Sequence, residues 1–297
     1  MAKCLTRMEN NRSGNLSATR DSEQSDKGHT AVAMPVDEMP QIPTSAASSQ
    51  AGSEASPMEG YQPQGTAWDP DRSDICELLL TARPAQIRSI YYGSNACYLV
   101  LLEHPTAGQS FAVYKPARGE YPLWDFPAGS LYKREIATYR IDRSLGWGLV
   151  PATVAAQGRF GIGSLQTFIE EADESAIAVT QLRKMALLDW IVNNADRKPD
   201  HLLIGHHGRL WGIDHGLTFH AQPKLRTILW HFAGLPFEDA ERAALERLEA
   251  DFSSGACSDV TELLTPPETR ALRRRVAALV QSEAFPDPQY KAIPYRW

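Results

Sequence analysis

Acidic and histidine side chains gather in one stretch of the sequence, residues 193–216, which reads NNADRKPDHLLIGHHGRLWGIDHG. Its 24 positions hold three aspartates and four histidines. Aspartates can bind a magnesium ion or take up a proton during phosphoryl transfer, whereas histidines suit zinc and other transition metals. A third interpretation is a polar surface hairpin that carries out no chemistry. The spacing of these residues, and the elements around them, must decide among the three.

A short hairpin is expected to carry two of the aspartates. The runs HLLI and RLWGI are typical of strands, and residues 205–208 (GHHG) form the turn between them. Asp196 precedes the first strand and Asp214 follows the second, so the two carboxylates can meet in space although 18 positions separate them. Such a pair suits Mg²⁺, which takes a few carboxylates and leaves the rest of its shell to water and phosphate.

A lysine lies earlier in the chain, on a predicted strand. The run QSFAVYKP is rich in β-forming residues and ends at a proline. The alternation of side chains along a strand puts Phe111, Val113 and Lys115 on one face. Lys115 then either extends past its apolar neighbours to water, or is held as a cation over an anionic ligand. This strand alone leaves both interpretations open.

A glutamate lies on the helix predicted after that strand. We expect Ser130 to cap this helix and Gly146 to end it. Glu135 falls on a face that also carries apolar residues. One interpretation is an ordinary solvated glutamate. The other is a partner for Lys115, because an acid on a packing face usually needs a cation.

The histidines provide the main rival interpretation, a dedicated zinc site. Six of the eight histidines fall between His201 and His231. They form no HExxH motif, and no cysteine lies near enough in sequence to complete a zinc ligand set. A serine hydrolase is also disfavoured, because the chain has no GxSxG motif. The aspartate interpretation is therefore the better supported one.

The arrangement of these motifs resembles a kinase active centre. Asp196-Arg197 is followed by a hairpin and then by the Ile-Asp-His-Gly-Leu run at residues 213–217, and Asp189 lies seven residues before Asp196. These sequence motifs resemble those of the phosphatidylinositol 3-/4-kinase superfamily. They are most similar to those of phosphatidylinositol 4-kinase type II. The stretch YKPARGEYPLWDFPAGSLYKRE, residues 114–135, is typical of a bacterial branch of that superfamily.

The resemblance implies a fold and an activity. The implied fold is α+β, a bilobed protein-kinase-like fold with a small β-rich N-lobe and a mostly helical C-lobe. The implied activity is phosphoryl transfer from ATP that depends on Mg²⁺ or Mn²⁺. The phosphate acceptor, whether protein, lipid or small molecule, stays open. The alternative is a pseudokinase, which binds a nucleotide or a partner without turnover.

The resemblance also implies a role for each of four charged residues. Lys115 corresponds to the strand lysine that contacts the α- and β-phosphates, and Glu135 to the helix glutamate that orients it. Asp196 corresponds to the acid that accepts the proton of the attacking hydroxyl. Asp214 corresponds to the acid that holds the metal against the β- and γ-phosphates. This division of work suits phosphoryl transfer, in which positioning and charge neutralisation supply most of the rate.

Further positions follow from the same resemblance. The turn Gly93-Ser94-Asn95 is expected to cover the phosphates, although it carries one glycine where protein kinases carry three. Residues 166–170, beginning at Gln166, are expected to contact the adenine. His201 stands where the superfamily has a metal-binding asparagine. Imidazole suits Mn²⁺ or Zn²⁺ better than Mg²⁺, so His201 raises the question of which metal is used.

Composition places this site in a soluble globular protein. The chain has 297 residues, 43% of them hydrophobic, and a net charge of −6, which gives no reason to expect nucleic acid as a partner. No apolar run reaches the length of a transmembrane segment, and the N-terminus lacks the apolar core of a signal peptide. The four cysteines form no CxxC pair. We therefore expect reduced thiols and a cytoplasmic location.

The composition changes sharply near residue 70. Residues 1–70 contain two aromatic side chains and long runs of serine, alanine, glycine and proline. Such a segment buries too little apolar surface to offset the entropy lost on ordering, so we predict a disordered tail. The kinase-like domain is expected at residues 71–297, with the N-lobe at about 71–170 and the C-lobe at about 171–297.

Overall fold

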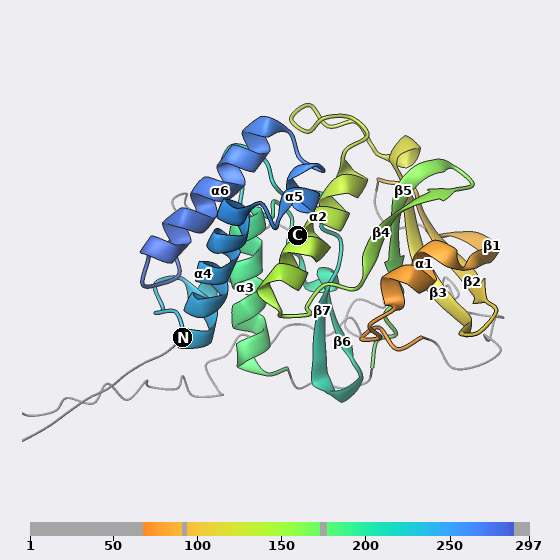
Figure 1. Ribbon diagram of the computed structural model, residues 1–297, viewed down its shortest axis with the longest axis horizontal. Coiled ribbons are helices and arrows are strands. Elements are labelled where there is room, and N and C mark those ends of the chain that lie inside the picture. Colours follow the sequence, from red (N-terminus) through yellow and green to blue (C-terminus); the bar gives the residue numbers. More distant parts are fainter. Residues whose placement is uncertain (1–67, 91–93, 173–176, 288–297) are drawn as a thin grey trace, which may run out of the picture. The chain divides into compact units, whose positions relative to one another are not determined.

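The computed structural model describes residues 68–90, 94–172 and 177–287 (Figure 1). The predicted disordered tail lies outside these residues except for its last three positions, and Gly93 also lies outside them. The described part begins at Trp68, which is 4% exposed. Its indole Nε1 donates to the carbonyl of Ala107 at 2.8 Å, and its backbone N–H donates to Ser110 Oγ at 3.2 Å. The folded part thus includes this tryptophan, just before the boundary expected near Asp71.

The first half of the described chain forms a five-stranded antiparallel sheet with the order β1-β2-β3-β5-β4. The strands are β1 (Arg83–Ile90), β2 (Cys97–His104), β3 (Gly108–Pro116), β4 (Thr153–Gly158) and β5 (Gly161–Thr167). Strand β2 is the apolar run CYLVLLEH and is mostly buried, while β1 at the sheet edge is mostly exposed. The short helix α1 (Ile75–Thr81) packs against the sheet.

Helix α2 (Leu131–Leu145) lies between β3 and β4 in sequence and packs on β4 and β5. It ends as expected at Gly146, whose φ of 70° is the left-handed conformation typical of a helix C-terminus. The cap expected from the Ser130 side chain is not formed. Ser130 has helical backbone angles, and its Oγ donates to the carbonyl of Pro127. Glu120 acts in its place, because its Oε1 accepts the backbone N–H of Tyr132 at 2.9 Å.

The second half of the described chain is mostly helical. Its helices are α3 (Val179–Val192), α4 (Asp239–Ser254), the short α5 (Ser258–Thr261) and α6 (Pro266–Gln281). Helix α6 packs against both α3 and α4. Helix α3 is apolar almost all round, and its side chains Leu187, Leu188 and Ile191 are fully buried, as expected of a central helix. In Figure 1 the sheet and the group formed by α3, α4 and α6 lie on opposite sides of α2.

The predicted hairpin is present as β6 (Leu202–Gly205) and β7 (Arg209–Gly212). A turn of 3-10 helix joins the strands, and His207 has a φ of 62° within it. Another 3-10 turn, η4 (Pro199–His201), leads into β6. An antiparallel sheet followed by a helical lobe confirms the expected α+β class. None of the helices among the described residues is long and apolar enough to cross a membrane.

Candidate active site

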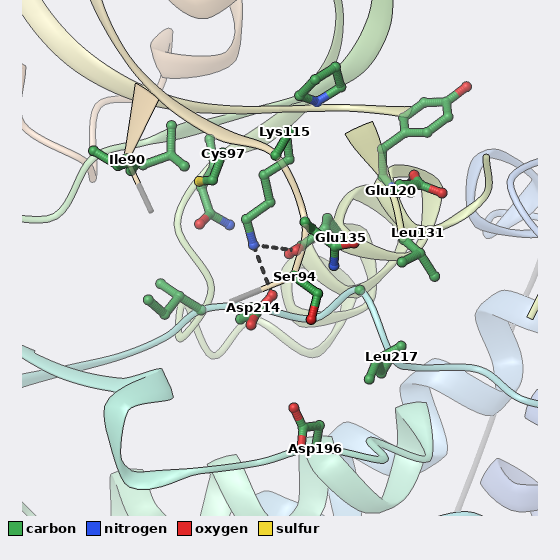
Figure 2. Close-up of a pocket in the computed structure, with 18 of the residues that line it drawn as sticks. Ile90, Ser94, Cys97, Lys115, Glu120, Leu131, Glu135, Asp196, Asp214 and Leu217 are labelled. Carbon is green, nitrogen blue, oxygen red and sulfur yellow. Dashed lines mark hydrogen bonds and ion pairs between the residues drawn. The ribbon is translucent and has the colours of Figure 1, made fainter. Parts of the chain in front are cut away.

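Three charged side chains from three different elements meet at the centre of the site. Lys115, near the end of β3, places its Nζ 2.6 Å from Glu135 Oε1 on α2 and 3.0 Å from Asp214 Oδ1 (Figure 2). The second oxygen of Glu135 accepts the backbone N–H of His215 at 2.9 Å. The glutamate therefore fixes both the lysine and the backbone that carries Asp214.

Burial strengthens the electrostatic coupling within this cluster, because charges interact more strongly away from water. Lys115 holds the pKa of Asp214 well below its ordinary value, although burial acts in the opposite direction. Burial alone lowers the pKa of Lys115, but Asp214 and Glu135 together raise it above its ordinary value. Lysine and aspartate are both charged at neutral pH as a result.

Asp214 has an unusual backbone. Its φ is 58°, in the left-handed region that non-glycine residues seldom adopt, so the conformation is strained. The strained backbone directs the side chain to two partners at once, because Oδ1 contacts Lys115 while Oδ2 lies 3.3 Å from His201 Nε2. His201 is 3% exposed and does not line the cavity described below.

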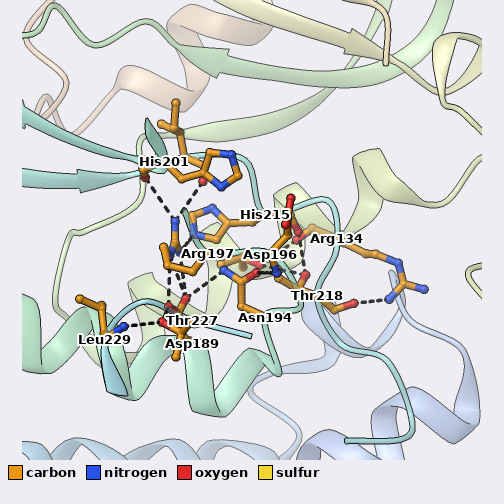
Figure 3. A network of polar contacts seen from close by, with 12 residues as sticks. Arg134, Asp189, Asn194, Asp196, Arg197, His201, His215, Thr218, Thr227 and Leu229 are labelled. Carbon is orange, nitrogen blue, oxygen red and sulfur yellow. Dashed lines mark hydrogen bonds and ion pairs between the residues drawn. The ribbon is translucent and has the colours of Figure 1, made fainter. Parts of the chain in front are cut away.

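Arg197 holds the site together from inside. Its guanidinium is fully buried and pairs with the equally buried Asp189 of α3 at 2.9 Å. It also donates to the carbonyls of His201 and Ile213 at 3.2 Å each, and lies 2.7 Å from Nε2 of His215 (Figure 3). Arg197 therefore connects helix α3, the chain before β6 and the chain after β7.

The two site histidines are neutral imidazoles. Burial, followed by the charge of Arg197, holds the pKa of His215 well below its ordinary value. Because an arginine can only donate, His215 Nε2 accepts this hydrogen bond and carries its proton on Nδ1. Burial also lowers the pKa of His201, against the opposing effect of Asp214. Neutral imidazole is the form of histidine that binds a metal.

Two asparagines position the segment that carries Asp196. Asn193 ends α3 with a φ of 53°, and its amide donates to the carbonyls of His220 and Gln222 at 2.9 and 2.8 Å. Asn194 donates to Asp189 at 2.9 Å and accepts the backbone N–H of Asp196 at 3.0 Å. Sequence reasoning did not assign these roles, although polar residues directly after an apolar helix are a signal that could have suggested them.

A lysine that sequence reasoning also missed lies beside Asp196. Lys198 Nζ is 2.7 Å from Asp196 Oδ2, and both side chains are partly exposed. Both residues line the same cavity as Lys115, Glu135 and Asp214. Asp196 and Asp214 thus share one cavity, as expected from their places at the two ends of the hairpin.

The cavity has a volume of about 910 Å³ and opens between the sheet and the hairpin. One part of its wall is largely apolar and includes Ile90, Cys97, Val113, Phe168 and Ile213. Other lining residues come from the chain after Asp196, from the β3–α2 loop, from α2 and from the chain after Asp214. These are Glu120, Tyr121, Leu123, Leu131, Tyr132, Lys198, Asp200, Gly216 and Leu217.

Most of the residues expected to contact a nucleotide also line this cavity. Ser94, Asn95, Gln166, Phe168 and Ile169 lie in its wall, whereas Thr167 and Glu170 do not line it and Gly93 is outside the described residues. The Asn95 side chain accepts the backbone N–H of Tyr121 at 2.6 Å, so it holds two loops together. The Gln166 side chain is buried and donates to Thr153 Oγ1 at 2.8 Å.

The donor set fits a divalent metal that also takes ligands from phosphate. In the described part of the chain, no group of three or more histidine, cysteine, aspartate or glutamate side chains is placed to hold a metal ion. Mg²⁺ in phosphate-binding sites needs only one or two protein ligands, because phosphates and water complete its shell. The 3.3 Å between His201 Nε2 and Asp214 Oδ2 is close to the separation of neighbouring ligands on one octahedral ion.

The chain is similar to known proteins that include members of a kinase family. Residues 155–268 match the family described as Phosphatidylinositol 3- and 4-kinase. Protein Rv2133c of Mycobacterium tuberculosis is 34% identical over 268 residues, which cover 75% of this chain and 95% of that protein. Phosphatidylinositol 4-kinase gamma 4 of Oryza sativa subsp. japonica is 28% identical over 168 residues, which cover 47% of this chain and 30% of that protein.

A comparison with solved structures found kinases as well. The crystal structure of the Golgi casein kinase with Mn/ADP bound superimposes with a TM-score of 0.46 at 14% sequence identity. The match covers 73% of this chain and 80% of that structure. A Helicobacter pylori proinflammatory kinase, CtkA, superimposes with the same TM-score at 10% identity, covering 69% of this chain and 94% of that structure.

Proposed function

Because the chain belongs to the phosphatidylinositol 3- and 4-kinase superfamily, in a bacterial branch with Protein Rv2133c, we propose that it is an ATP- and divalent-metal-dependent phosphotransferase. The observation that carries the proposal is the arrangement of Lys115, Glu135 and Asp214 in one cavity with Asp196. In this proposal Lys115 is the fixed cation, Asp214 the metal-binding acid and Asp196 the base, which are the groups that phosphoryl transfer requires.

The nucleotide is proposed to lie along the wall of the sheet. The apolar side chains Ile90, Val113 and Ile213 suit the faces of an adenine ring. The chain that follows Gln166 would supply the backbone groups for the adenine edge. Ser94 and Lys115 would contact the phosphates, with Lys115 held in place by Glu135.

Asp214 and His201 are the residues proposed to hold the metal. When bound, the ion neutralises charge on the β- and γ-phosphates. Asp214 is already ionised, and His201 is neutral, so neither residue needs to lose a proton before it binds an ion. The left-handed backbone of Asp214 would keep its carboxylate directed at such an ion.

Asp196 is the residue proposed to receive the proton of the acceptor. The acceptor hydroxyl oxygen attacks the γ-phosphorus, a new P–O bond forms, and the bond to the oxygen that bridges the β- and γ-phosphates breaks. ADP leaves, and the hydroxyl proton passes to the Asp196 carboxylate. Asn194 fixes Asp196 through its backbone, and Lys198 places a positive charge beside it.

A pseudokinase is the second candidate function, and two observations favour it. His201 replaces the usual metal-binding amide and lies behind Asp214, away from the cavity wall. Lys198 neutralises the proposed base in the structure. A pseudokinase would bind ATP without transferring its γ-phosphate.

Nucleotide-dependent stabilisation and turnover together test both functions. We expect ATP with Mg²⁺ or Mn²⁺ to raise the free energy of unfolding by about 2–3 kcal/mol at a hundredfold excess over its dissociation constant. Asp214→Asn should remove the metal-dependent part of this increase. Release of the γ-phosphate from labelled ATP then separates the active kinase from the pseudokinase. If ATP causes no stabilisation with either metal, both candidates fail.

The choice of metal tests the proposed role of His201. Because imidazole is a softer ligand than an amide oxygen, the wild-type protein should favour Mn²⁺ over Mg²⁺. His201→Asn should shift the preference towards Mg²⁺, and His201→Ala should lose metal affinity without unfolding the protein. A Mn²⁺/Mg²⁺ ratio that stays the same in the asparagine variant would rule out His201 as a ligand.

A further inference from the structure

The cavity is unevenly charged near the proposed base. Six acids and three cations line it among the described residues. Lys115 is engaged by Glu135 and Asp214, and Lys198 by Asp196. Arg88, the third cation, lies on β1, the strand that also places Ile90 in the apolar wall. On the acceptor side, Lys198 is thus the lining cation, and it is already paired.

Acidic groups line this side of the cavity as well. Asp200 is exposed, and the structure shows no ion pair for it among the described residues. The turn η4 points Asp200 to the cavity while it buries His201, its neighbour in sequence. A phosphorylated acceptor would have to bring further negative charge next to Asp196 and Asp200, which is repulsive. An acceptor without negative charge avoids this repulsion.

The rim of the cavity carries an aromatic surface, here called the aromatic lip (residues 121–124, YPLW). Tyr121 and Leu123 line the cavity, and Trp124 follows directly. Tyr121 is 61% exposed and Trp124 is 92% exposed, which makes Trp124 the most exposed large hydrophobic side chain in the described part of the chain. Exposed aromatic rings beside a cavity are characteristic of a binding surface.

The aromatic lip is held in place from the other side of the site. Lys224 Nζ forms an ion pair with Asp125 at 2.5 Å and lies 5.1 Å from the centre of the Trp124 ring. Phe126 packs edge-on against His220, with ring centroids 5.3 Å apart. These contacts tie the β3–α2 loop to the segment after Asp214. The loop that carries Trp124 is therefore held in place, and the exposed ring contacts Lys224 on one side.

We propose that the phosphate acceptor is a polyhydroxy compound without negative charge, of the sugar or amino-sugar class, which stacks on the aromatic lip and donates hydrogen bonds to Asp200. Sugar rings have apolar C–H faces that match an aromatic ring, and their hydroxyl groups donate to carboxylates. An ammonium group on the sugar would add attraction to the acidic side of the cavity. This inference rests on the proposed function, because the acceptor must meet Asp196 and the γ-phosphate.

The lip offers less to the other acceptors that a kinase of this family could take. An anionic lipid surface is attracted by unpaired lysines and arginines, whereas Lys224 beside the lip is paired with Asp125. Lys198, which lines the cavity beside Asp196, is likewise paired, because its Nζ contacts the Asp196 carboxylate. Charge complementarity therefore favours a neutral or cationic acceptor over the headgroup of a phosphorylated lipid.

Transfer of labelled phosphate from ATP by the full-length protein tests the proposal. The probes are glucose, glucosamine, glucose 6-phosphate, a serine peptide, and vesicles of phosphatidylcholine with phosphatidylinositol. We expect transfer to glucose or glucosamine with a kcat/KM at least roughly tenfold above that for glucose 6-phosphate, the difference that about one unfavourable charge contact produces. Transfer mainly to glucose 6-phosphate, the peptide or the vesicles would overturn the proposal.

Variants of the lip and of Asp200 show whether these residues select the acceptor. Trp124→Ala should raise the KM of the accepted sugar roughly tenfold and leave the ATP dissociation constant unchanged. Asp200→Lys should shift the preference from glucosamine towards glucose 6-phosphate. Leu80→Ala is the matched control, because Leu80 is 59% exposed on α1, outside the residues that line the cavity. A KM that Trp124→Ala leaves unchanged counts against the lip.

The same assay separates failure of this inference from failure of the proposed function. A protein that binds ATP and metal but transfers phosphate to none of the five probes contradicts the sugar assignment. A protein that binds no ATP with either metal contradicts the proposed function itself.

Discussion

Two carboxylates share the single ammonium group of Lys115, and under the proposed function this sharing prepares the site for a nucleotide. Glu135 lies closer to Nζ, at 2.6 Å, and is almost fully buried, while Asp214 lies at 3.0 Å and is more exposed. A phosphate that contacts Lys115 can therefore take the place of Asp214, which is then available to a metal. Glu135 stays with the lysine throughout and keeps it in position.

Removal of the Lys115 charge tests this arrangement. We expect Lys115→Met to lower the rate of ATP turnover by on the order of 10²–10³, because the lysine stabilises charge that develops on the phosphates. Lys115→Arg keeps the charge but changes its position, so it should recover only part of the rate. The measurement is kcat alongside the ATP dissociation constant. A kcat within threefold of the wild-type value in the methionine variant would exclude this role.

Arg197 joins three segments of the site through its buried guanidinium. Its partner Asp189 is fully buried, so removal of the guanidinium leaves an uncompensated buried charge. We expect Arg197→Met to lower the free energy of unfolding by about 3–5 kcal/mol. The double variant Arg197→Met with Asp189→Leu should recover part of this loss, because it removes the stranded charge as well.

Urea denaturation of these variants provides the measurement, and an exposed ion pair provides the control. Arg72 and Asp74 lie 2.8 Å apart at the surface, so Arg72→Ala should change the free energy of unfolding far less than Arg197→Met does. Equal losses in the free energy of unfolding for Arg197→Met and Arg72→Ala would show that the buried ion pair stabilises the fold no more than the exposed one.

Sequence patterns could predict contacts between individual side chains only where a strand or helix meets another strand or helix. The periods of the strand and of the helix put Lys115 and Glu135 on faces with apolar neighbours and left their pairing as one of two interpretations, and the structure has this contact. The roles of Asn193, Asn194 and Arg197 depend on how three irregular segments pass one another. No local pattern encodes that path, so their partners become visible only in the folded chain.

At the scale of elements, helix α2 is the part that links the sheet to the helical lobe. Near its start, Arg134 is buried and contacts Glu268 of α6 at 2.5 Å and the carbonyl of Thr218 at 2.6 Å. Near its end, Asp142 Oδ2 accepts the backbone N–H groups of Leu149 and Val150 at 2.8 and 3.0 Å. Glu135 is thus carried by a helix that is fixed at both ends.

Asp142 makes the attachment of α2 sensitive to pH. Burial raises the pKa of this carboxyl group to about 7, although two backbone donors and the nearby Arg209 and Arg143 oppose the shift. An aspartate in the unfolded chain titrates near pH 4. Between about pH 4 and pH 7 the folded state holds a proton that the unfolded state has released, so this contribution to stability is lost as the pH rises through that window.

Asp142→Asn should remove this dependence, because an amide oxygen can accept the same two N–H groups without titrating. The free energy of unfolding of the wild type relative to the variant should rise by on the order of 2 kcal/mol from pH 7 to pH 5. Thermal or urea denaturation of both proteins at several pH values measures the difference between their free energies of unfolding. The contributions of the other carboxylates are the same in both proteins and cancel in this difference. A difference that does not vary with pH would show that Asp142 has an ordinary pKa.

The elements were predictable from sequence more readily than their ends. Strands β2 and β3 and helix α3 are runs rich in apolar residues, and burial of these runs fixes their conformation. The start of α2 was predicted with the wrong cap. Ser130 has the right residue type, but Glu120 from the preceding loop reaches the helix terminus instead. A side chain ten positions away lies outside the local pattern that identifies a cap.

At the scale of the whole molecule, the α+β architecture was predicted from the resemblance to a kinase family. The residue at which the folded part begins was predicted from amino-acid composition instead. Composition placed the boundary near Asp71. The structure shows that Trp68 belongs to the packed part, since its ring is 4% exposed and its indole donates to Ala107. One aromatic residue in a polar segment changes a composition average very little, but it contributes a large buried surface.

This tryptophan defines the truncation that the domain should tolerate. Deletion of residues 1–67 should leave the melting temperature and the ATP affinity unchanged, because the composition of that segment offers little apolar surface for the core. Trp68→Ala in the full-length chain should lower the free energy of unfolding by on the order of 3 kcal/mol, since it empties a buried site and removes the bond to Ala107. Thermal denaturation and ATP titration of both proteins give the comparison. A drop of several degrees after deletion of residues 1–67 would show that the segment contributes to the core, and an unchanged melting temperature in Trp68→Ala would show that the domain begins after it.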